Sequence, residues 1–231
     1  KKEFTDRLVS LLRTFPANAA GIALPGFLDE KRRRILHLSN LPKLDGLDLA
    51  ARLERRLKWK IILEADSNAG AIGEARLGAG RGIRRLLYLT MGTGLGAALT
   101  VKGIPVRVSN NTIGHIAGLP IGPAKKREAE KLLGARGILR RFREAGGDRR
   151  VSTPLALYEL ARSGDVGARA AWKETGELLS ELLAMLVPML RPDGVVLGGG
   201  IAGAADTFLP TTRRALRRCL RGFEPGCPEI F

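Results

Sequence analysis

Apolar residues near the start of the chain recur with two different spacings. Residues 3–15 and 47–58 repeat them at helical intervals, which predicts amphipathic helices. Residues 19–26 (AAGIALPG) and 60–66 (KIILEAD) are instead short continuous apolar runs, the first stopped by Pro-Gly and the second by acidic residues. Residues 67–78 return to a helical pattern. We therefore predict two buried strands separated by helices in this part of the chain.

The middle of the chain changes to closely spaced strands. Residues 85–90, 95–101 and 104–108 predict three antiparallel strands joined by short glycine-containing turns. Residues 124–144 and 154–190 are then mostly helical, and the second of these segments has a leucine-rich face broad enough to be core. This part of the chain therefore predicts a β-meander followed by helices.

The chain ends with one more alternation of strand and helix. The sequence DGVVLGGG at 193–200 predicts a strand ending in three glycines, and a helix follows through Arg218. Strands thus alternate with helices, form a meander and alternate again, which predicts an α/β protein with two lobes. We place the N-terminal lobe at residues 1–84 and the C-terminal lobe, which holds the glycine loops, at residues 85–231.

Composition limits the class of protein. The chain has 231 residues, 45% of them hydrophobic, which is enough for a packed core. No apolar run is long and uncharged enough to cross a bilayer, and the start resembles an amphipathic helix more than a signal peptide. The two cysteines, Cys219 and Cys227, form neither a disulfide framework nor a metal pattern. We expect a cytoplasmic protein with no membrane partner.

The charge is strongly positive. A formal net charge of +16 attracts anions such as nucleotides, sugar phosphates or nucleic acid. The alternative is that the basic side chains form an ordinary solvated surface. Nucleic-acid binding is not favoured, because the sequence carries no winged-helix, zinc-finger or RNA-binding signature.

Two glycine clusters lie at the ends of predicted strands. Residues 92–96 (GTGLG) join two strands, and a tight turn there can direct several backbone N–H groups at a phosphate. The alternative is an ordinary hairpin that needs positive φ. Residues 198–200 (GGG) lie between a strand and a helix, at the sheet edge where α/β proteins bind ligands. The alternative there is a tight strand-to-helix turn.

One carboxylate is placed where it could do chemistry. Asp66 lies where a predicted strand stops and a helix starts, so its side chain can reach into a cleft. In phosphoryl transfer such a group accepts the proton of the attacking hydroxyl. The alternative is that Asp66 caps the helix, and the residues alone favour that interpretation.

Four motifs together resemble one family. D-x-N-A-x-A-x-G-E at 66–74, LTMGTGLGAAL at 89–99, IGH at 113–115 and VVLGGG at 195–200 have the order and spacing of the ROK family of bacterial sugar kinases and sugar-responsive repressors. The upstream segments AGIALPG and SNLP also look like that family. The resemblance implies the actin-like ATPase (ribonuclease H-like) fold, with two lobes around a cleft.

The resemblance also implies an activity and a set of site residues. It implies a glucokinase-like transferase that uses ATP and Mg²⁺ to phosphorylate a hexose or related sugar, and a possible homodimer or homotetramer. Asp66 would be the catalytic base. The sugar would be bound by Asn40, His115 and Glu130, the ATP phosphates by Gly92, Thr93, Gly94 and Gly96, and the adenosine by Gly198, Gly199 and Gly200.

The sequence departs from the family pattern at three places. Ala65 replaces an asparagine and Thr112 a glutamate that would each hold the sugar. The three zinc cysteines expected near His115 are missing, so we expect no structural zinc and no protein-bound metal. Without the zinc, His115 would either contact the sugar or be a satisfied core histidine.

The sequence also lacks the family's opening Asp-x-Gly-Gly-Thr strand and its last helix. We therefore expect a fold that is incomplete at both ends, as in part of a longer chain, with apolar edges exposed. Two alternatives to a kinase remain open. One is a sugar-sensing regulator with a DNA-binding domain elsewhere, and the other is a catalytically weakened relative that binds sugar or nucleotide.

Overall fold

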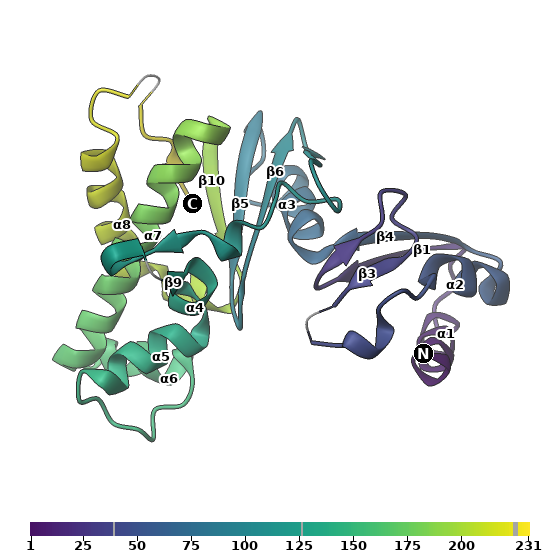
Figure 1. The fold of residues 1–231 in the computed structure, drawn as a ribbon, viewed down its shortest axis with the longest axis horizontal. Helices are drawn as coiled ribbons and strands as arrows, with labels where there is room; N and C mark the ends of the chain where they lie inside the picture. Colours follow the sequence, from purple (N-terminus) through teal and green to yellow (C-terminus); the bar gives the residue numbers. More distant parts are fainter. Residues whose placement is uncertain (39, 126, 224–225) are drawn as a thin grey trace.

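The computed structural model describes residues 1–38, 40–125, 127–223 and 226–231. Two lobes lie side by side in Figure 1, and the chain passes from one to the other at residues 65 and 66. The first lobe contains α1 (Lys2–Leu12), β1 (Ala19–Leu24), β2 (Phe27–Leu28), β3 (Ile35–His37), the 3-10 turn η1 (Pro42–Leu44), α2 (Leu49–Leu57) and β4 (Lys60–Ala65).

The second lobe is the larger one. It begins with α3 (Asp66–Leu77), β5 (Arg85–Met91), β6 (Leu95–Val101), β7 (Ile104–Pro105), η2 (Ile116–Gly118), β8 (Pro120–Ile121), η3 (Pro123–Lys125) and β9 (Arg127–Glu128). It continues with α4 (Ala129–Leu133), α5 (Ala135–Glu144), α6 (Pro154–Arg162), α7 (Val166–Leu190), β10 (Gly194–Gly198), η4 (Gly200–Ala204), α8 (Ala205–Cys219) and β11 (Glu229–Ile230).

The first lobe is built on β1 and β4, which pair in parallel from Ala19↔Lys60 to Leu24↔Ala65. Helix α2 begins where the Asp48 side chain accepts the N–H of Ala51 at 3.1 Å, and it ends at Lys58 in the left-handed conformation. Its apolar stripe, including Leu49 and Leu53, is fully buried against the sheet and α1. This packing is what the helical spacing of the sequence predicts.

The prediction that residues 19–26 form a buried strand is wrong in one respect. The strand is there as β1, but its residues alternate between exposed and partly buried positions until Leu24. In β4, the strand that pairs with β1, Ile62 is 45% exposed. The cause is that α1, α2 and their neighbours cover one face of this two-stranded sheet, so a continuous apolar sequence is buried on one side only.

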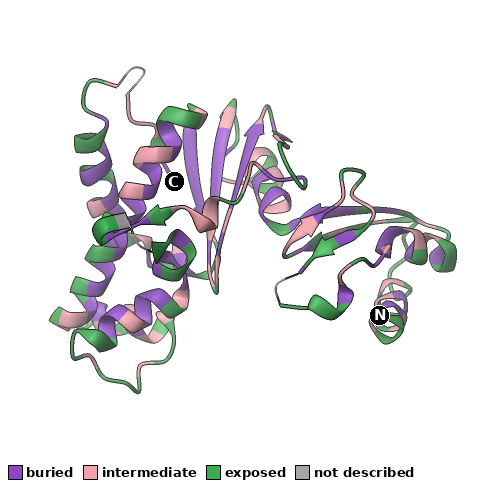
Figure 2. Cartoon of the chain, viewed as in Figure 1, coloured by how far each residue is buried: buried purple, intermediate pink, exposed green. Residues whose placement is uncertain are grey.

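The second lobe is built on a mixed five-stranded sheet in the order β11-β10-β5-β6-β7. Strands β5, β6 and β7 form the predicted antiparallel meander, whereas β10 and β11 join in parallel. Side chains alternate between the two faces of the sheet: Leu87 and Leu89 join the large core beneath α7 and α8, and Leu86 and Tyr88 join a small cluster with α3. Figure 2 shows this burial along the strands and the inner side of α7.

Helix α3 packs on the second lobe's sheet, against β5 and β6. Tyr88 of β5 is wedged between two glycines on neighbouring elements. A Cβ at Gly70 of α3 would lie 2.7 Å from the Tyr88 ring, and a Cβ at Gly198 of β10 would collide with the Tyr88 hydroxyl. The division at residue 84 that the sequence suggests stays a prediction, but the packing joins α3 to the second sheet.

The two segments predicted to be mostly helical are confirmed. In residues 124–144 the helices are α4 and α5, and the short strand β9 of the β8–β9 hairpin precedes them. Residues 154–190 form two helices, α6 and α7, separated at Gly164, whose φ of +106° suits glycine. Within the described parts of the chain, no helix is long and apolar enough to cross a bilayer.

Candidate functional site

A hollow of about 750 Å³ lies where the two lobes meet. The first lobe contributes the Pro25–Phe27 turn, and the second contributes the start of α3, the β5–β6 turn and the first turns of α4 and α5. Most of the predicted site residues line it: Asn40, Asp66, Gly92, Thr93, Gly94, Gly96, His115 and Glu130. The structure thus brings residues that are up to 90 positions apart into one cavity.

Asp66 is the first residue of α3, and its carboxylate is exposed to the hollow. The capping alternative is wrong, because the N-cap position belongs to Ala65 and, among the described residues, the helix has no side-chain cap bond. Oδ1 of Asp66 accepts the N–H of the next residue, Ser67, at 2.7 Å. Protein atoms around the rest of the side chain partly bury it, and this burial raises the pKa of Asp66 above its ordinary value of 3.8. A carboxylate with a raised pKa accepts a proton more readily.

The β5–β6 turn has unused donors. Within the described residues, the backbone N–H groups of Thr93 and Gly94 have no hydrogen-bond acceptor, whereas the N–H of Gly92 is bonded to the carbonyl of Gly94 at 3.0 Å. The alternative of a hairpin that needs positive φ is wrong, because neither Gly92 nor Gly94 has one. The turn can therefore offer N–H groups to an anion.

The glycines of this turn are explained by close contacts with neighbouring elements. A Cβ at Gly96 would lie 2.7 Å from Thr90 and 3.3 Å from the Cβ of Ser67, so β6 can approach the start of α3 only without a side chain there. The N–H of Ala135 donates to the carbonyl of Gly92 at 2.9 Å, which fixes the turn to α5. Asp66 and the turn therefore belong to one rigid part of the molecule.

Glu130 contacts the same turn. Its Oε2 accepts the N–H of Leu95 at 3.2 Å, and a Cβ at Gly94 would lie 2.5 Å from that oxygen. The side chain is exposed to the hollow and comes from the first turn of α4. Its predicted contact with a sugar stays a prediction, and in this structure the carboxylate stabilises the β5–β6 turn.

The second glycine cluster lies beside the first. Gly198 pairs with Thr90 across the β10–β5 ladder. Gly199 has a φ of +83°, and a Cβ there would collide with the backbone of Met91, the residue before the β5–β6 turn. Gly199 and Gly200 are exposed but do not line the hollow. The triplet is thus a tight strand-to-helix turn that packs against the start of the β5–β6 turn. Its contact with adenosine stays a prediction.

His115 and Asn40 face the hollow from opposite lobes. The interpretation of His115 as a core histidine is wrong, since the residue is exposed. Its ring meets the edge of Phe27 in the first lobe at a centroid distance of 6.1 Å. Asn40 is exposed. Both side chains are therefore free to meet a ligand that spans the two lobes.

Comparison with known proteins agrees with this geometry. The model of the ROK family matches residues 4–231. The chain belongs to the ROK family. It is 30% identical over 209 residues to the glucokinase of Halalkalibacterium halodurans, an alignment that covers 82% of this chain and 63% of that protein. The chain thus spans less than two thirds of the length of this ROK relative.

Solved ROK structures share the fold. The ROK hexokinase from Thermus thermophilus is 27% identical, with a TM-score of 0.83 over 100% of this chain and 80% of that one. A ROK transcriptional regulator, a homolog of the E. coli MLC protein, reaches a TM-score of 0.87 at 17% identity, over 99% of this chain and 64% of that one. The predicted actin-like ATPase fold is confirmed.

The two departures from the ROK sugar site have different surroundings. Ala65 is 1% exposed, so its methyl group is packed away from solvent. The hydroxyl of Thr112 donates to the carbonyl of Ser109 at 3.1 Å and accepts the N–H of Gly114 at 3.1 Å. Thr112 lines the hollow but its hydroxyl serves the local turn. Asp66 and Glu130 are then the carboxylates among the described lining residues.

Sequence reasoning missed a basic group at the hollow. Lys131, Arg136 and Arg140 line its far end, near the β5–β6 turn. Arg136 and Arg140 lie one turn apart on α5, so both face the same side of that helix. The i, i+4 spacing of Arg136 and Arg140 in the sequence could have indicated a basic helix face. Only the structure shows that the start of α5 contacts Gly92 of the β5–β6 turn. Lys131 and Arg140 are already paired with Glu128 and Glu144, so Arg136 is the cation of this group that most favours an anionic ligand here.

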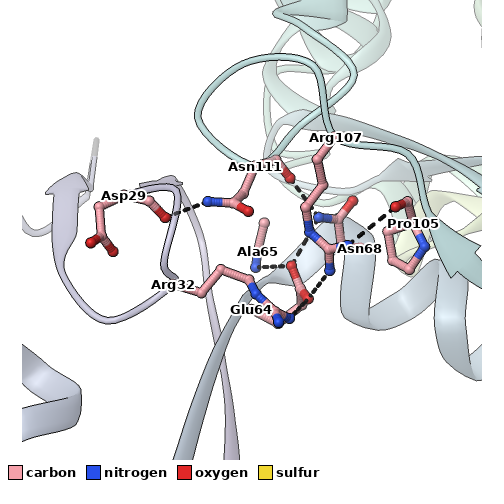
Figure 3. Close-up of polar contacts among 8 residues, drawn as sticks. All are labelled: Asp29, Arg32, Glu64, Ala65, Asn68, Pro105, Arg107 and Asn111. Atoms are coloured by element: carbon pink, nitrogen blue, oxygen red, sulfur yellow. Dashed lines mark hydrogen bonds and ion pairs between the residues drawn. The ribbon is translucent and has the colours of Figure 1, made fainter.

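A second polar cluster, outside the lining of the hollow, joins the lobes (Figure 3). Glu64 of β4 is 8% exposed and receives hydrogen bonds from Arg32 at 2.9 Å and Arg107 at 2.6 Å. Asn68 donates to Glu64 at 2.9 Å and to the carbonyl of Asn111 at 2.7 Å. Burial opposes ionisation of Glu64, but the bonds from Asn68, Arg107 and Arg32 outweigh it and hold its pKa below the ordinary 4.5.

Metal ligands are sparse in the structure. Across residues 1–38, 40–125, 127–223 and 226–231, no group of three or more His, Cys, Asp or Glu side chains gathers for an ion. The expectation that the chain binds no structural zinc stays a prediction.

Proposed function

We propose that this chain forms the catalytic cleft of an ATP-dependent kinase that phosphorylates a hexose or a related sugar. The observation that carries the proposal is that Asp66, with its raised pKa, opens into the same hollow as the unbonded N–H groups of the β5–β6 turn. A proton acceptor and a phosphate-binding turn on one rigid unit are what phosphoryl transfer to a hydroxyl requires. Similarity to a glucokinase and to a ROK hexokinase supports the same activity.

Asp66 would accept the proton of the sugar hydroxyl while that oxygen forms its bond to the γ-phosphorus. The bond between the γ-phosphorus and the bridging oxygen breaks, and ADP leaves with the bonding electron pair. Thr93 and Gly94 would donate their N–H groups to phosphate oxygens, and Arg136 and Arg140 would balance the negative charge from α5. Magnesium bound with the nucleotide would supply further charge neutralisation.

The sugar would lie between the lobes. Asn40 and the Pro25–Phe27 turn would contact it from the first lobe, and His115 and Glu130 from the second. Because Ala65 and Thr112 leave out an amide and a carboxylate of the ROK pattern, we expect weaker discrimination among hydroxyl configurations. A non-glucose hexose or an N-acetylhexosamine is therefore a substrate to test beside glucose.

The deciding experiment is an ADP-release assay on the chain in its natural full-length context, with ATP, Mg²⁺ and a panel of hexoses, N-acetylhexosamines and polyols. We expect ADP release that depends on one sugar and is abolished by Asp66→Asn. Binding of the non-hydrolysable analogue AMP-PNP is measured in parallel by calorimetry. A folded protein that binds AMP-PNP and sugar without releasing ADP would overturn the kinase proposal.

That last outcome would favour a second candidate, a protein that binds sugar and does not turn it over. The observation behind it is the pair of departures at Ala65 and Thr112, together with the likeness of the fold to a ROK transcriptional regulator. Sugar-dependent binding of the full-length protein to DNA, measured by fluorescence anisotropy, would then identify a regulator.

A further inference from the structure

The hollow is formed by two bodies with different roles. Asp66, the β5–β6 turn and Glu130 are tied to one another on the second lobe, through the contact of Gly96 with Ser67 and the bond from Leu95 to Glu130. The Pro25–Phe27 turn and Asn40 belong to the first lobe. A sugar in the hollow would touch both bodies, whereas a nucleotide would touch mainly the second.

In the part of the chain that the structure describes, the backbone passes from one body to the other at residues 65 and 66, with no linker. Strand β4 ends at Ala65 and α3 begins at Asp66, so one strand of the first lobe runs directly into a helix packed on the second. The angle between the lobes then depends on the backbone conformation at residues 64–66 and on the side-chain contacts that join the lobes. Any change in that angle moves Asn40 relative to Asp66.

Glu64, next to this crossing, makes side-chain contacts with both lobes. Its carboxylate accepts hydrogen bonds from Arg32 on the first lobe and from Arg107 on the second (Figure 3). The Arg107 side chain is only 26% exposed and also donates to the carbonyl of Pro105 at 3.2 Å, which fixes the guanidinium to the end of β7. We call this group of three residues, Arg32, Glu64 and Arg107, the Glu64 bridge.

A second contact runs parallel to the bridge. The side chain of Asn111 donates to the carbonyl of Asp29, which crosses from the second lobe to the first. Asn111 and Asn110 both have positive φ, at 62° and 47°, so the loop is bent tightly toward the first lobe. Asn68 connects the two contacts, because its amide donates to both Glu64 and the carbonyl of Asn111.

Arg107 is the residue of the Glu64 bridge whose substitution tests the contact between the lobes most directly. Two guanidiniums share one carboxylate, so removing Arg107 leaves Glu64 still paired with Arg32 inside the first lobe. Glu64 therefore keeps one charged partner, and the substitution does not leave a buried carboxylate unpaired. What is lost is the ionic contact between the lobes.

We propose that Arg107 is a positioning residue for sugar binding, acting through Glu64 to fix the angle between the two lobes. The kinetic part of this proposal rests on the proposed kinase function. Arg107 does not line the hollow, so it would act on the distance between the two bodies without touching substrate. The bridge would hold Asn40 and Asp66 at the spacing that a sugar needs.

The kinetic test is Arg107→Met in the full-length protein. We expect the KM for sugar to rise roughly tenfold, comparable to other allosteric couplings, while the Kd for AMP-PNP and the acid limb of the kcat–pH profile stay within twofold of wild type. Arg107→Lys keeps a charge that can reach Glu64 and should recover part of the loss. The matched control is Arg34→Met, which removes an exposed arginine of the Arg32 loop with no side-chain partner among the described residues.

Glu64→Gln keeps the test decisive if Arg107→Met folds poorly, because it removes the same contact and should raise the sugar KM in the same direction. Where Arg107→Met does fold, combining it with Glu64→Gln should add little to either single change. An unchanged sugar KM in the Arg107 variants, an equal rise in Arg34→Met, or a shifted pH profile would overturn the proposal.

A readout without turnover separates this proposal from the kinase assignment. Small-angle X-ray scattering of the sugar-free protein should give a larger radius of gyration for Arg107→Met than for wild type and Arg34→Met. If wild type shows no ADP release but the variant still expands, the kinase proposal fails and the bridge stands. If neither the radius of gyration nor sugar binding responds to Arg107, the bridge fails whatever the activity.

Discussion

The two lobes solve the same packing problem on different scales. The first lobe covers one face of a two-stranded parallel sheet with two helices, and leaves Ile62 of that sheet 45% exposed. The second lobe buries both faces of a five-stranded sheet, with α3 on one face and α7 and α8 on the other. Trp172 and Phe208 stack in that larger core at 5.9 Å and are both fully buried.

This difference in core size suggests that the two lobes have different roles at the hollow. In the proposed kinase, the groups that would need precise placement for chemistry, Asp66 and the β5–β6 turn, lie on the lobe with the larger core. The smaller lobe contributes Asn40 and the Pro25–Phe27 turn to the hollow, and we propose that they contact a ligand only when the lobes are correctly spaced. Elements that move in recognition are expected to come from the less stable part of a structure.

The largest expected effect is a loss of turnover on substitution of Asp66 in the second lobe. Asp66→Asn removes the proton acceptor but keeps the size of the side chain, so kcat should fall by roughly 10²–10⁴-fold. AMP-PNP affinity, measured by calorimetry, should change by less than about threefold, since the β5–β6 turn is untouched. Asp148→Asn, the same change at a carboxylate that does not line the hollow, is the matched control and should keep wild-type turnover. A variant at Asp66 with normal turnover would contradict the base assignment.

The next effect separates the two cores. Leu53→Ala truncates a fully buried side chain of the first lobe and should cost about 2–5 kcal/mol of stability. Because Leu53 belongs to a different cluster from the second-lobe core, sugar binding should weaken before AMP-PNP binding does. The measurement is segment-resolved hydrogen exchange together with both affinities.

The matched variant in the second lobe is Leu183→Ala, which truncates an equally buried leucine of α7. We expect it to weaken both affinities, because the β5–β6 turn is built on that core. Equal loss of nucleotide binding in Leu53→Ala and Leu183→Ala would mean that the lobes unfold as one unit.

A smaller effect sharpens the nucleotide end of the hollow. Arg136→Met removes a cation on α5 that lines the hollow near the turn, and the KM for ATP should rise roughly tenfold, about 1.4 kcal/mol. The KM for sugar should stay within about twofold, because the first lobe is unaffected. Arg143→Met, on the same helix but outside the hollow, is the control. A change in the KM for sugar without a change in the KM for ATP would contradict the assignment of Arg136 to nucleotide binding.

The smallest effect concerns the contact between the lobes. The pKa of Glu64 is lowered in the folded protein, so its stabilisation is complete above its ordinary pKa of 4.5 and is lost as the pH falls through the lower folded-state value. The difference in unfolding free energy between wild type and Glu64→Gln should therefore be constant from pH 7 to about pH 5.5 and shrink in more acidic solution. Urea unfolding at several pH values measures it, and a difference that grows below pH 4.5 would contradict the assignment.

The regular elements were predictable because their patterns are local. The amphipathic spacing of α2 and α7 and the closely spaced strands β5 and β6 follow from side-chain periodicity alone. The burial of β1 was not predictable, because a continuous apolar run does not say how many layers will cover it. The β8–β9 hairpin was missed since each strand has only two residues.

The site was predictable only where a motif marked it. The β5–β6 turn and Asp66 carry recognisable sequence, and the structure places both at one hollow. Arg136 and the Glu64 bridge carry none, because they depend on which distant segments meet. Arg32, Glu64 and Arg107 are separated by 32 and 43 residues, and no periodicity relates them. Likewise, the bond from Leu95 to Glu130 depends on how α4 packs against the turn.

Tyr88 has a consequence for how this sequence can vary. Its ring occupies the space where side chains of Gly70 and Gly198 would lie, so either glycine can gain a methyl group only if the tyrosine shrinks or turns away. One bulky residue on β5 therefore constrains two backbone positions, one on the helix that carries Asp66 and one at the glycine triplet. We therefore expect a larger side chain at either glycine to be tolerated only together with a smaller residue at Tyr88, so a laboratory library should randomise the three positions jointly.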